Sequence, residues 1–243
     1  GGGVGGGGGG AGGLAPPIAS AAWPPSGLPE GGAQAQSSPD EAAAKSRLAT
    51  AGLPVPAGFR AATADEAVAA ADALGYPVAV KALGVAHKSE AGAVKLNLRD
   101  ADAVRAAAVA MAGLGTGLYV ERMVTGGVAE LIVGITRDPL FGPVMTVGTG
   151  GVLVELLKDS RTLLLPSGRE DISAALRSLK MFPLLDGYRG RPKADLEAAI
   201  DAIERIADFA LVTDVAEMDI NPLIVCEKDA WVADALIVLG QTK

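Results

Sequence analysis

The sequence predicts an α+β protein with two lobes. Capped helical segments alternate with strands in the first half of the chain, and closely spaced strands in the second half favour antiparallel hairpins. A strand–loop–strand stretch stands out between them: the apolar run Val78–Lys81 and the alternating segment Val94–Leu98 flank a loop that holds His87. A lysine leaving a strand beside a loop is one way to hold a polyphosphate, because its ammonium supplies charge and the loop N–H groups supply donors.

Composition excludes several classes of protein. The 243 residues are 49% hydrophobic, which is ample for a sizeable core, and aromatics are only 4%, so Ala, Val, Leu and Ile must build it. A net charge of −7 argues against nucleic acid as a partner. The chain has one cysteine, Cys226, in an apolar run; this predicts a buried thiol without a disulfide and favours a reducing cytoplasm. No run approaches the roughly 18 apolar residues of a membrane-spanning helix, so no membrane contact is expected.

The first 37 residues differ from all that follow. They are rich in Gly, Pro, Ala and Gln, a composition that loses much entropy on ordering and has little to bury. We therefore expect residues 1–37 to be a linker or tail and residues 38–243 to form the folded domain. Within it, residues 38–120 are expected to form an N-terminal lobe and residues 121–243 a C-terminal lobe.

Helix signals mark the folded part. Ser38 followed by Pro39 predicts an N-cap and first turn for a helix that runs to about Thr50, and Thr63 predicts the cap of a second helix that ends at Gly75. Asp100 caps a third. The remaining expected elements are strands at Leu118–Val120, Leu131–Ile135, Pro143–Val147 and Val152–Leu157, helices over 170–180 and 194–210, and closing strands at Ala216–Val225, broken at Pro222, and Trp231–Val238.

Three groups of side chains could carry chemistry. Lys81 could bind a phosphate, or it could simply extend its ammonium from a strand end into water. Glu121 and Glu130 precede or begin strands, where a carboxylate can accept two hydrogen bonds from a ribose diol; both could also be ordinary surface carboxylates.

The third group lies near the C-terminus. Asp219 and Asn221 are two residues apart on an extended segment and therefore share a face. A hairpin could bring Asp234 alongside them. Carboxylate and amide oxygens, completed by phosphates and water, suit Mg²⁺. The alternative is a structural turn built around Asn221 and Pro222.

Weaker signals accompany these groups. The glycines of Gly148–Gly151 could admit a phosphate, although a tight turn is the simpler interpretation. Arg189 could bind an anion or face water. His87 is the only histidine, so a zinc site or an acid–base pair built from histidines is excluded.

Taken together and in this order, the motifs resemble the ATP-grasp fold. More narrowly, the chain resembles the β-type ATP-grasp subunit or domain of ADP-forming acyl-CoA synthetases, such as acetate–CoA ligase (ADP-forming), which are relatives of succinyl-CoA synthetase. The resemblance covers about Ser38 to Leu239. The motifs that carry it are His87-Lys-Ser-Glu-Ala-Gly92, Phe141-Gly-Pro-Val-Met145 with Gly148-Thr-Gly-Gly151, Asp186-Gly-Tyr-Arg-Gly190, and Asp219-Ile-Asn-Pro-Leu223 with Val232-Ala-Asp-Ala235.

The resemblance implies a nucleotide, ATP or ADP, bound between two lobes with Mg²⁺. Lys81 would contact its phosphates, with Gly92 in the phosphate-binding loop. Glu121, Arg122 and Met123 would form the hinge that meets adenine, and Glu130 would bind ribose. Asn221 and Asp234 would hold Mg²⁺, and Asp219 would ligate it or align the transfer. His87 corresponds to a relaying phospho-carrier, since an imidazole is a competent nucleophile for phosphate.

The implied reaction converts acyl-CoA, ADP and phosphate to acid, CoA and ATP. The resemblance places CoA and a small carboxylic acid on a CoA-binding partner, either a separate α subunit or fused domains, so a hetero-oligomer is expected. One departure concerns the loop, where the family usually has Gly-Gly-Val and this chain has Gly92-Ala93-Val94. An added methyl group could restrict the approach of the backbone to phosphate.

Two other functions remain open. A nucleotide-binding regulatory module of a protein acetyltransferase-type fusion would keep the fold with its nucleotide chemistry lost. A different ATP-grasp carboxylate ligase would form an acyl-phosphate that an amine captures, although the His-Lys-Ser loop speaks against it.

Overall fold

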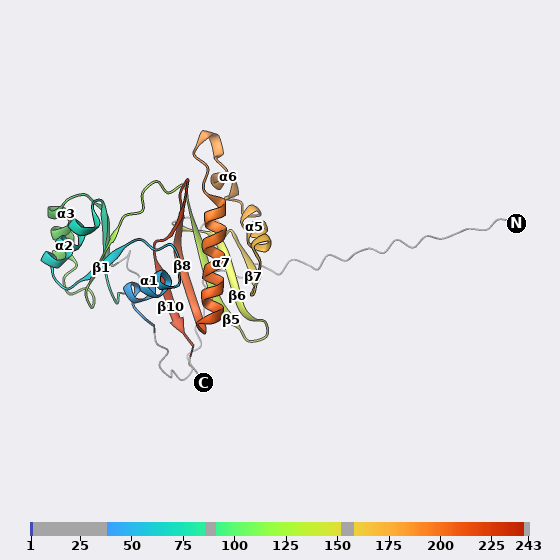
Figure 1. Cartoon of the computed structure of the whole chain (residues 1–243), viewed down its shortest axis with the longest axis horizontal. Coiled ribbons are helices and arrows are strands. Elements are labelled where there is room, and N and C mark those ends of the chain that lie inside the picture. The colour runs from blue at the N-terminus through green and yellow to red at the C-terminus, as the bar shows by residue number, and fades with distance from the viewer. Residues whose placement is uncertain (2–37, 86–90, 152–157, 241–243) are drawn as a thin grey trace.

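The computed structural model describes Gly1 and residues 38–85, 91–151 and 158–240. It contains two antiparallel sheets, as the α+β prediction requires (Figure 1). The predicted strand at Val152–Leu157 and the His87 loop lie outside the described residues.

The N-terminal sheet has four strands in the order β1-β4-β2-β3. These are β1 (Gly58–Ala61), β2 (Val78–Ala82), β3 (Val94–Leu98) and β4 (Leu118–Arg122). Helices α2 (Ala64–Leu74) and α3 (Ala101–Ala110) cover one face. Their small apolar side chains pack there against Val78 and Val80 of β2 and Leu118 and Val120 of β4, so alternate residues of both strands point away from the helices.

The C-terminal sheet has six strands. Its order is β10-β8-β5-β6-β7, and β9 pairs with the end of β8. Helices α5 (Arg169–Arg177), α6 (Phe182–Leu185) and α7 (Leu196–Val212) contribute to the larger core on one side of this sheet. The strands are β5 (Ala129–Asp138), β6 (Gly142–Thr149), β7 (Ser160–Leu164), β8 (Val215–Val225), β9 (Ala230–Val232) and β10 (Ala235–Leu239).

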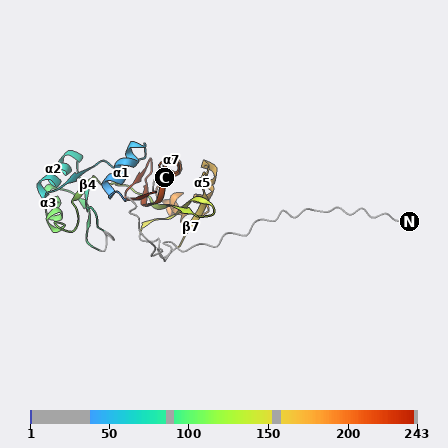
Figure 2. The same cartoon turned by 90° about the horizontal axis from the view of Figure 1, so that it is seen from below.

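Helix α1 (Glu41–Thr50) joins the two sheets. Ala44 and Leu48 enter the core of the C-terminal lobe, whereas Ala42 packs on Leu83 and Tyr119 of the N-terminal lobe. Both views show α1 between the α2–α3 lobe and α7 (Figures 1 and 2). Charged residues on the buried side of α1 must therefore find partners between the lobes.

Most predicted elements are present with shifted ends. Helix α1 begins at Glu41 with Asp40 as its N-cap, not Ser38, because the Asp40 carboxylate accepts from the Ala43 N–H (3.0 Å). Thr63 and Asp100 cap α2 and α3 as predicted. Strand β4 continues through Arg122, two residues past the expected lobe boundary. The predicted strand at Trp231–Val238 divides into β9 and β10, whereas β8 runs through Pro222 without a break.

Four short elements were not predicted: β1, β7, α6 and the 3-10 helix η2 (Tyr188–Gly190). Cys226 is buried, as predicted, at 8% exposure. Among the helices in the described part of the chain, none has the length and apolar character needed to cross a membrane.

Candidate functional site

Strand alternation places Lys81 and Glu121 on the same face of the N-terminal sheet. Val80 and Val120 point into the core beneath α2 and α3, so Lys81 and Glu121, each one residue further along, point to the opposite side. That side faces α1. Both residues are almost completely buried, at 5% and 4% exposure.

The Lys81 ammonium meets three acceptors. Its Nζ lies 2.6 Å from Glu41 Oε1, 2.8 Å from Glu121 Oε1 and 2.8 Å from the Ala233 carbonyl oxygen. Burial opposes its charge, but Glu121, Glu41 and Asp234 outweigh burial, so the pKa of Lys81 is raised above its ordinary value. Lys81 is therefore a permanent cation at the junction of the lobes, not a surface lysine.

A second lysine, Lys45 of α1, enters the same cluster. Lys45 is 1% exposed and donates to Glu121 Oε2 and to the Ala233 carbonyl, and its Nζ lies 3.4 Å from Glu41 Oε1. Its ammonium also lies 5.7 Å from the centre of the Tyr119 ring. Burial and the charge of Lys81 together lower the pKa of Lys45. Two lysines and two glutamates thus form a closely packed group with balanced formal charge.

The predicted acidic group assembles beside this cluster. Asn221 and Asp234 are brought together by β8 and the β9–β10 junction, where the Asn221 N–H donates to the Asp234 carbonyl at 3.3 Å. Asp219 lies two residues before Asn221 on β8, opposite Leu236 of β10. The core side of β8 is formed by Met218 and Ile220, so Asp219 and Asn221 occupy the opposite side.

The Asp219 carboxylate has an oxygen atom that could bind a cation. Its Oδ1 is buried without a hydrogen-bond partner. Burial, with the charges of Asp234 and Glu217, raises its pKa to about 6. Within the described residues no three His, Cys, Asp or Glu side chains group tightly enough to hold a metal alone. Two carboxylates and an amide nevertheless fit Mg²⁺, which commonly takes one or two protein carboxylates together with phosphates and water.

Gly150 and Gly151 leave space for Glu130 and for the backbone of the neighbouring strand. A Cβ on Gly151 would lie 2.0 Å from Glu130 Oε2, and one on Gly150 would lie 2.7 Å from the Leu131 carbonyl oxygen. The Gly150 N–H also donates to the Glu130 carbonyl at 2.8 Å. Glu130 is exposed at the start of β5. In the structure, these glycines therefore make room for a carboxylate and a neighbouring strand.

The other predicted contacts lie around the first sheet. Gly92 has φ +67°, and a Cβ there would meet nothing within 4 Å. Ala93 is fully buried in the core beneath α2 and α3, so its methyl group points into the lobe and not onto the loop surface. The N–H groups of Arg122 and Met123 donate to the Ala57 and Pro77 carbonyls, at 2.9 and 3.1 Å.

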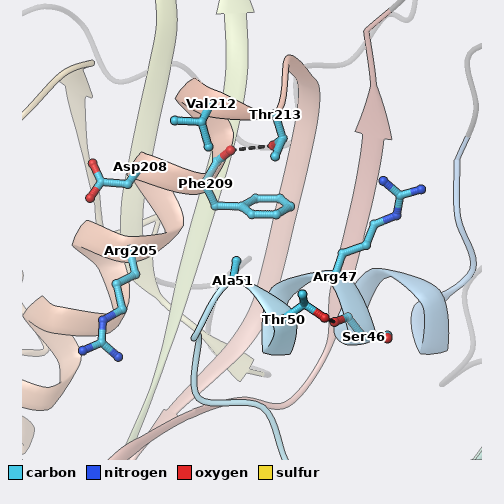
Figure 3. A pocket seen from close by; sticks show the side chains of 9 residues that line it. All are labelled: Ser46, Arg47, Thr50, Ala51, Arg205, Asp208, Phe209, Val212 and Thr213. Atoms are coloured by element: carbon cyan, nitrogen blue, oxygen red, sulfur yellow. Dashed lines mark hydrogen bonds between the residues drawn. The ribbon is translucent and has the colours of Figure 1, made fainter.

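A separate groove of about 540 Å³ lies between α1 and α7 (Figure 3). Phe209 of α7 points towards Ala51 at the end of α1, and Arg47 and Arg205 flank the opening. None of the predicted site residues that the structure describes lines this groove.

Comparison with known proteins identifies the family to which this chain belongs. The family of ATP-grasp domains matches residues 32–239. The β subunit of acetate–CoA ligase (ADP-forming) I from Pyrococcus furiosus is 36% identical over 211 residues, which cover 82% of this chain and 90% of that subunit. The chain belongs to the ATP-grasp family, and to the β-subunit type of ADP-forming acetate–CoA ligases. The β subunit of succinate–CoA ligase from Natronomonas pharaonis is also related, at 36% identity.

Solved structures agree with this assignment. Acetyl-coenzyme A synthetase 1 of Candidatus Korarchaeum cryptofilum, in complex with coenzyme A and Ca-AMPCP, has 35% identity and a TM-score of 0.78, over 84% of this chain and 93% of that chain. The chain spans a smaller part of other relatives: acetate–CoA ligase (ADP-forming) II from Archaeoglobus fulgidus is 38% identical, but only 27% of its length is matched. The ATP-grasp fold predicted from the motifs is therefore confirmed.

Two residues of the cluster were not predicted from the sequence. Glu41 and Lys45 are four residues apart on one face of α1, in the alanine-rich segment Glu41-Ala-Ala-Ala-Lys45. Such a spacing is common for exposed ion pairs that stabilise a helix. The available signal was that the same face also carries Leu48, which belongs to the core.

Proposed function

We propose that this chain is the ATP-grasp component of an ADP-forming acyl-CoA synthetase. It would transfer phosphate between ATP or ADP and a phospho-histidine relay, in a reaction that interconverts acyl-CoA, ADP and phosphate with acid, CoA and ATP. The observation that carries this proposal is the 2.8 Å contact between Lys81 Nζ and the carbonyl oxygen of Ala233. The contact joins Lys81 of the N-terminal lobe, the predicted phosphate ligand, to Ala233 of the C-terminal lobe. Ala233 directly precedes Asp234, the predicted metal ligand.

Each site residue has a proposed role that follows from its position. Lys81 places a permanent positive charge where the phosphates would lie, and Glu130 would accept hydrogen bonds from the ribose. The hinge from Glu121 to Met123 would meet the adenine. Asn221 and Asp234 would hold Mg²⁺, with Asp219 close by. When bound, Mg²⁺ neutralises charge on the phosphates during transfer.

The transfer itself needs a nucleophile. In the direction of ATP consumption, an imidazole nitrogen attacks the γ-phosphorus, the bond to the bridging oxygen breaks, and ADP leaves as phospho-histidine forms. Lys81 would stabilise the negative charge of the phosphates, and the buried setting strengthens that interaction. His87 lies outside the described residues, and its role as a relay remains a proposal from the motif.

A solved relative supports a nucleotide and a phosphohistidine segment as parts of the reaction. One Korarchaeum structure, 36% identical to this chain, contains coenzyme A and Mg-AMPPCP with a phosphohistidine segment pointing towards the nucleotide binding site. For this chain we propose ATP or ADP and Mg²⁺ as ligands. We also propose a CoA-binding partner, either a separate α subunit or fused domains, which would bring the small carboxylic acid.

Calorimetric titration of the full chain with ADP tests the nucleotide site. We expect binding that requires Mg²⁺ and that weakens at least tenfold in Lys81→Ala and in Asp234→Ala. Lys95→Ala and Asp208→Ala are matched controls, because these residues carry the same charges on exposed surfaces of β3 and α7. Unchanged ADP affinity in both site variants would overturn the proposal.

A further inference from the structure

Lys45 and Lys81 share the same three acceptors. Both ammonium groups contact Glu41, Glu121 and the Ala233 carbonyl, and both lysines are almost fully buried. A lysine ammonium has three N–H donors and no acceptor. The three contacts of Lys81 therefore use its whole donor capacity within the protein.

This arrangement creates a conflict for a phosphate-binding lysine. Lys81 can donate to a phosphate only by giving up at least one of its present acceptors. An acceptor released in a buried setting loses its compensation, which is costly for a carboxylate. A second cation within reach of the same acceptors removes that cost.

We infer that Lys45 is a positioning residue that releases Lys81 to the nucleotide, by taking over its acceptors Glu41, Glu121 and the Ala233 carbonyl. Lys45 already donates to two of them, and Glu41 needs to approach by less than an ångström from 3.4 Å to reach ordinary hydrogen-bond distance. Helix α1 thereby supplies the counter-charge for the site without touching the nucleotide. This inference rests on the proposed contact between Lys81 and the phosphates.

The charge count gives a specific expectation. When Lys81 turns to a phosphate, Glu41 and Glu121 lose one cation and keep Lys45. Relative to that state, removing Lys45 takes away one positive charge, removing Glu41 takes away one negative charge, and removing both leaves the net charge unchanged. Nucleotide affinity should follow this difference, because added negative charge beside Lys81 opposes its release.

The test measures ADP affinity with Mg²⁺ in the full chain for Lys45→Met, Glu41→Gln and the double variant. We expect Lys45→Met to bind at least tenfold more weakly than the wild type, because the loss of one favourable charge pair within about 4 Å is worth that much in a partly buried site. Glu41→Gln should bind at least as tightly as the wild type. The double variant should return to within about threefold of the wild type.

A purely structural role gives a different pattern. Both single variants would then bind more weakly in proportion to their loss of thermal stability, and the double variant would bind no better than Lys45→Met. That pattern would overturn the inference. Arg60→Gln is the matched control, because it removes the exposed ion pair between Arg60 of β1 and Asp40, the residue before α1. This variant should change ADP affinity less than twofold.

Three further outcomes are decisive. Loss of one partner from a buried ion pair can prevent folding. If Lys45→Met does not fold, Glu41→Gln and the double variant decide the question, since weaker binding in Glu41→Gln would contradict the charge count. If the wild-type chain binds ADP but Lys81→Ala binds equally well, the phosphate role fails and the inference fails with it. If Lys81→Ala loses binding while the α1 variants follow stability alone, only the inference fails.

Discussion

The carboxylate of Glu130 occupies the space where a side chain on Gly151 would begin. A Cβ at residue 151 would lie 2.0 Å from Glu130 Oε2, and Gly151 has φ +67°. Gly151→Ala should therefore both strain the backbone and displace the carboxylate proposed to bind ribose. We expect it to lower the free energy of unfolding by more than the roughly 1 kcal/mol of the strained backbone alone, as measured by urea denaturation.

Gly190→Ala isolates the backbone contribution. Gly190 has φ +77°, and a Cβ there meets nothing within 4 Å. It should lose only the roughly 1 kcal/mol expected for a left-handed alanine. In ligand binding, Gly151→Ala should also reduce the preference for ADP over 2′,3′-dideoxy-ADP, whereas Gly190→Ala should leave it unchanged. Equal effects of the two variants on both measurements would contradict the role of Glu130.

The half-buried Asp219 predicts an unusual dependence of stability on pH. Burial, with Asp234 and Glu217, raises its pKa from the ordinary 3.8 to about 6. The native protein then binds this proton more tightly than the unfolded chain does. The contribution of Asp219 to the free energy of unfolding therefore falls as pH rises from about 4 to about 6, by roughly 2–3 kcal/mol in total.

Asp219→Asn should remove that loss. We expect the variant to be more stable than the wild type at pH 8 by up to this amount and nearly equal to it at pH 4, in urea titrations without Mg²⁺. The same variant should bind Mg²⁺-ADP more weakly, because it loses a candidate ligand. Glu227→Gln, an exposed carboxylate in the turn before β9, is the control and should alter neither quantity. A variant that is less stable than the wild type at pH 8 would contradict the raised pKa.

Local patterns predicted β2, β3 and β4 of the N-terminal sheet. Val78–Lys81 and Val94–Leu98 were found within one residue, because apolar runs and strict alternation describe how a strand meets a core. The candidate metal residues Asn221 and Asp234 were also predicted to meet, since a hairpin is a short-range arrangement. The missed strands β1 and β7 are short and half-exposed, so neither shows a clear apolar pattern.

Long-range partners explain the remaining errors. Ser38 followed by Pro39 looks like the start of a helix, but the Ser38 hydroxyl donates to the Ile237 carbonyl of β10, 199 residues away, at 3.3 Å. Similarly, nothing near Lys45 in the sequence reveals that Glu121 and Ala233 lie against it. A local sequence pattern specifies which residues lie on one side of a helix, and the packing of the lobes decides what they meet there.

The N-cap of α1 can be tested directly. Asp40 accepts a hydrogen bond from the Ala43 N–H and forms an ion pair with Arg60, which lowers the pKa of its carboxyl group. Asp40→Ala should lower the free energy of unfolding by about 1–2 kcal/mol, the usual cost of losing a cap. Ser38→Ala should cost less, because Ser38 makes a single hydrogen bond outside the helix. The opposite order in urea denaturation would restore Ser38 as the cap.

The relay role of His87 is the sharpest functional prediction from the sequence motif. We expect phosphate on His87 when the chain is incubated with Mg²⁺-ATP and its CoA-binding partner. Because His87 is the only histidine in the chain, any phospho-histidine on it has one location. Phosphohistidine is labile in acid, so intact mass spectrometry should be run under alkaline conditions and repeated after acid treatment, which should remove the added phosphoryl group.

Two variants make the result interpretable. His87→Asn should abolish the added phosphoryl group, and Lys81→Ala should reduce it through weaker nucleotide binding. If the partner becomes phosphorylated during turnover while His87 stays unmodified, the relay role is excluded and the chain serves only the first transfer. If the chain binds Mg²⁺-ADP and neither protein is phosphorylated, the regulatory nucleotide-binding alternative explains the data better than catalysis does.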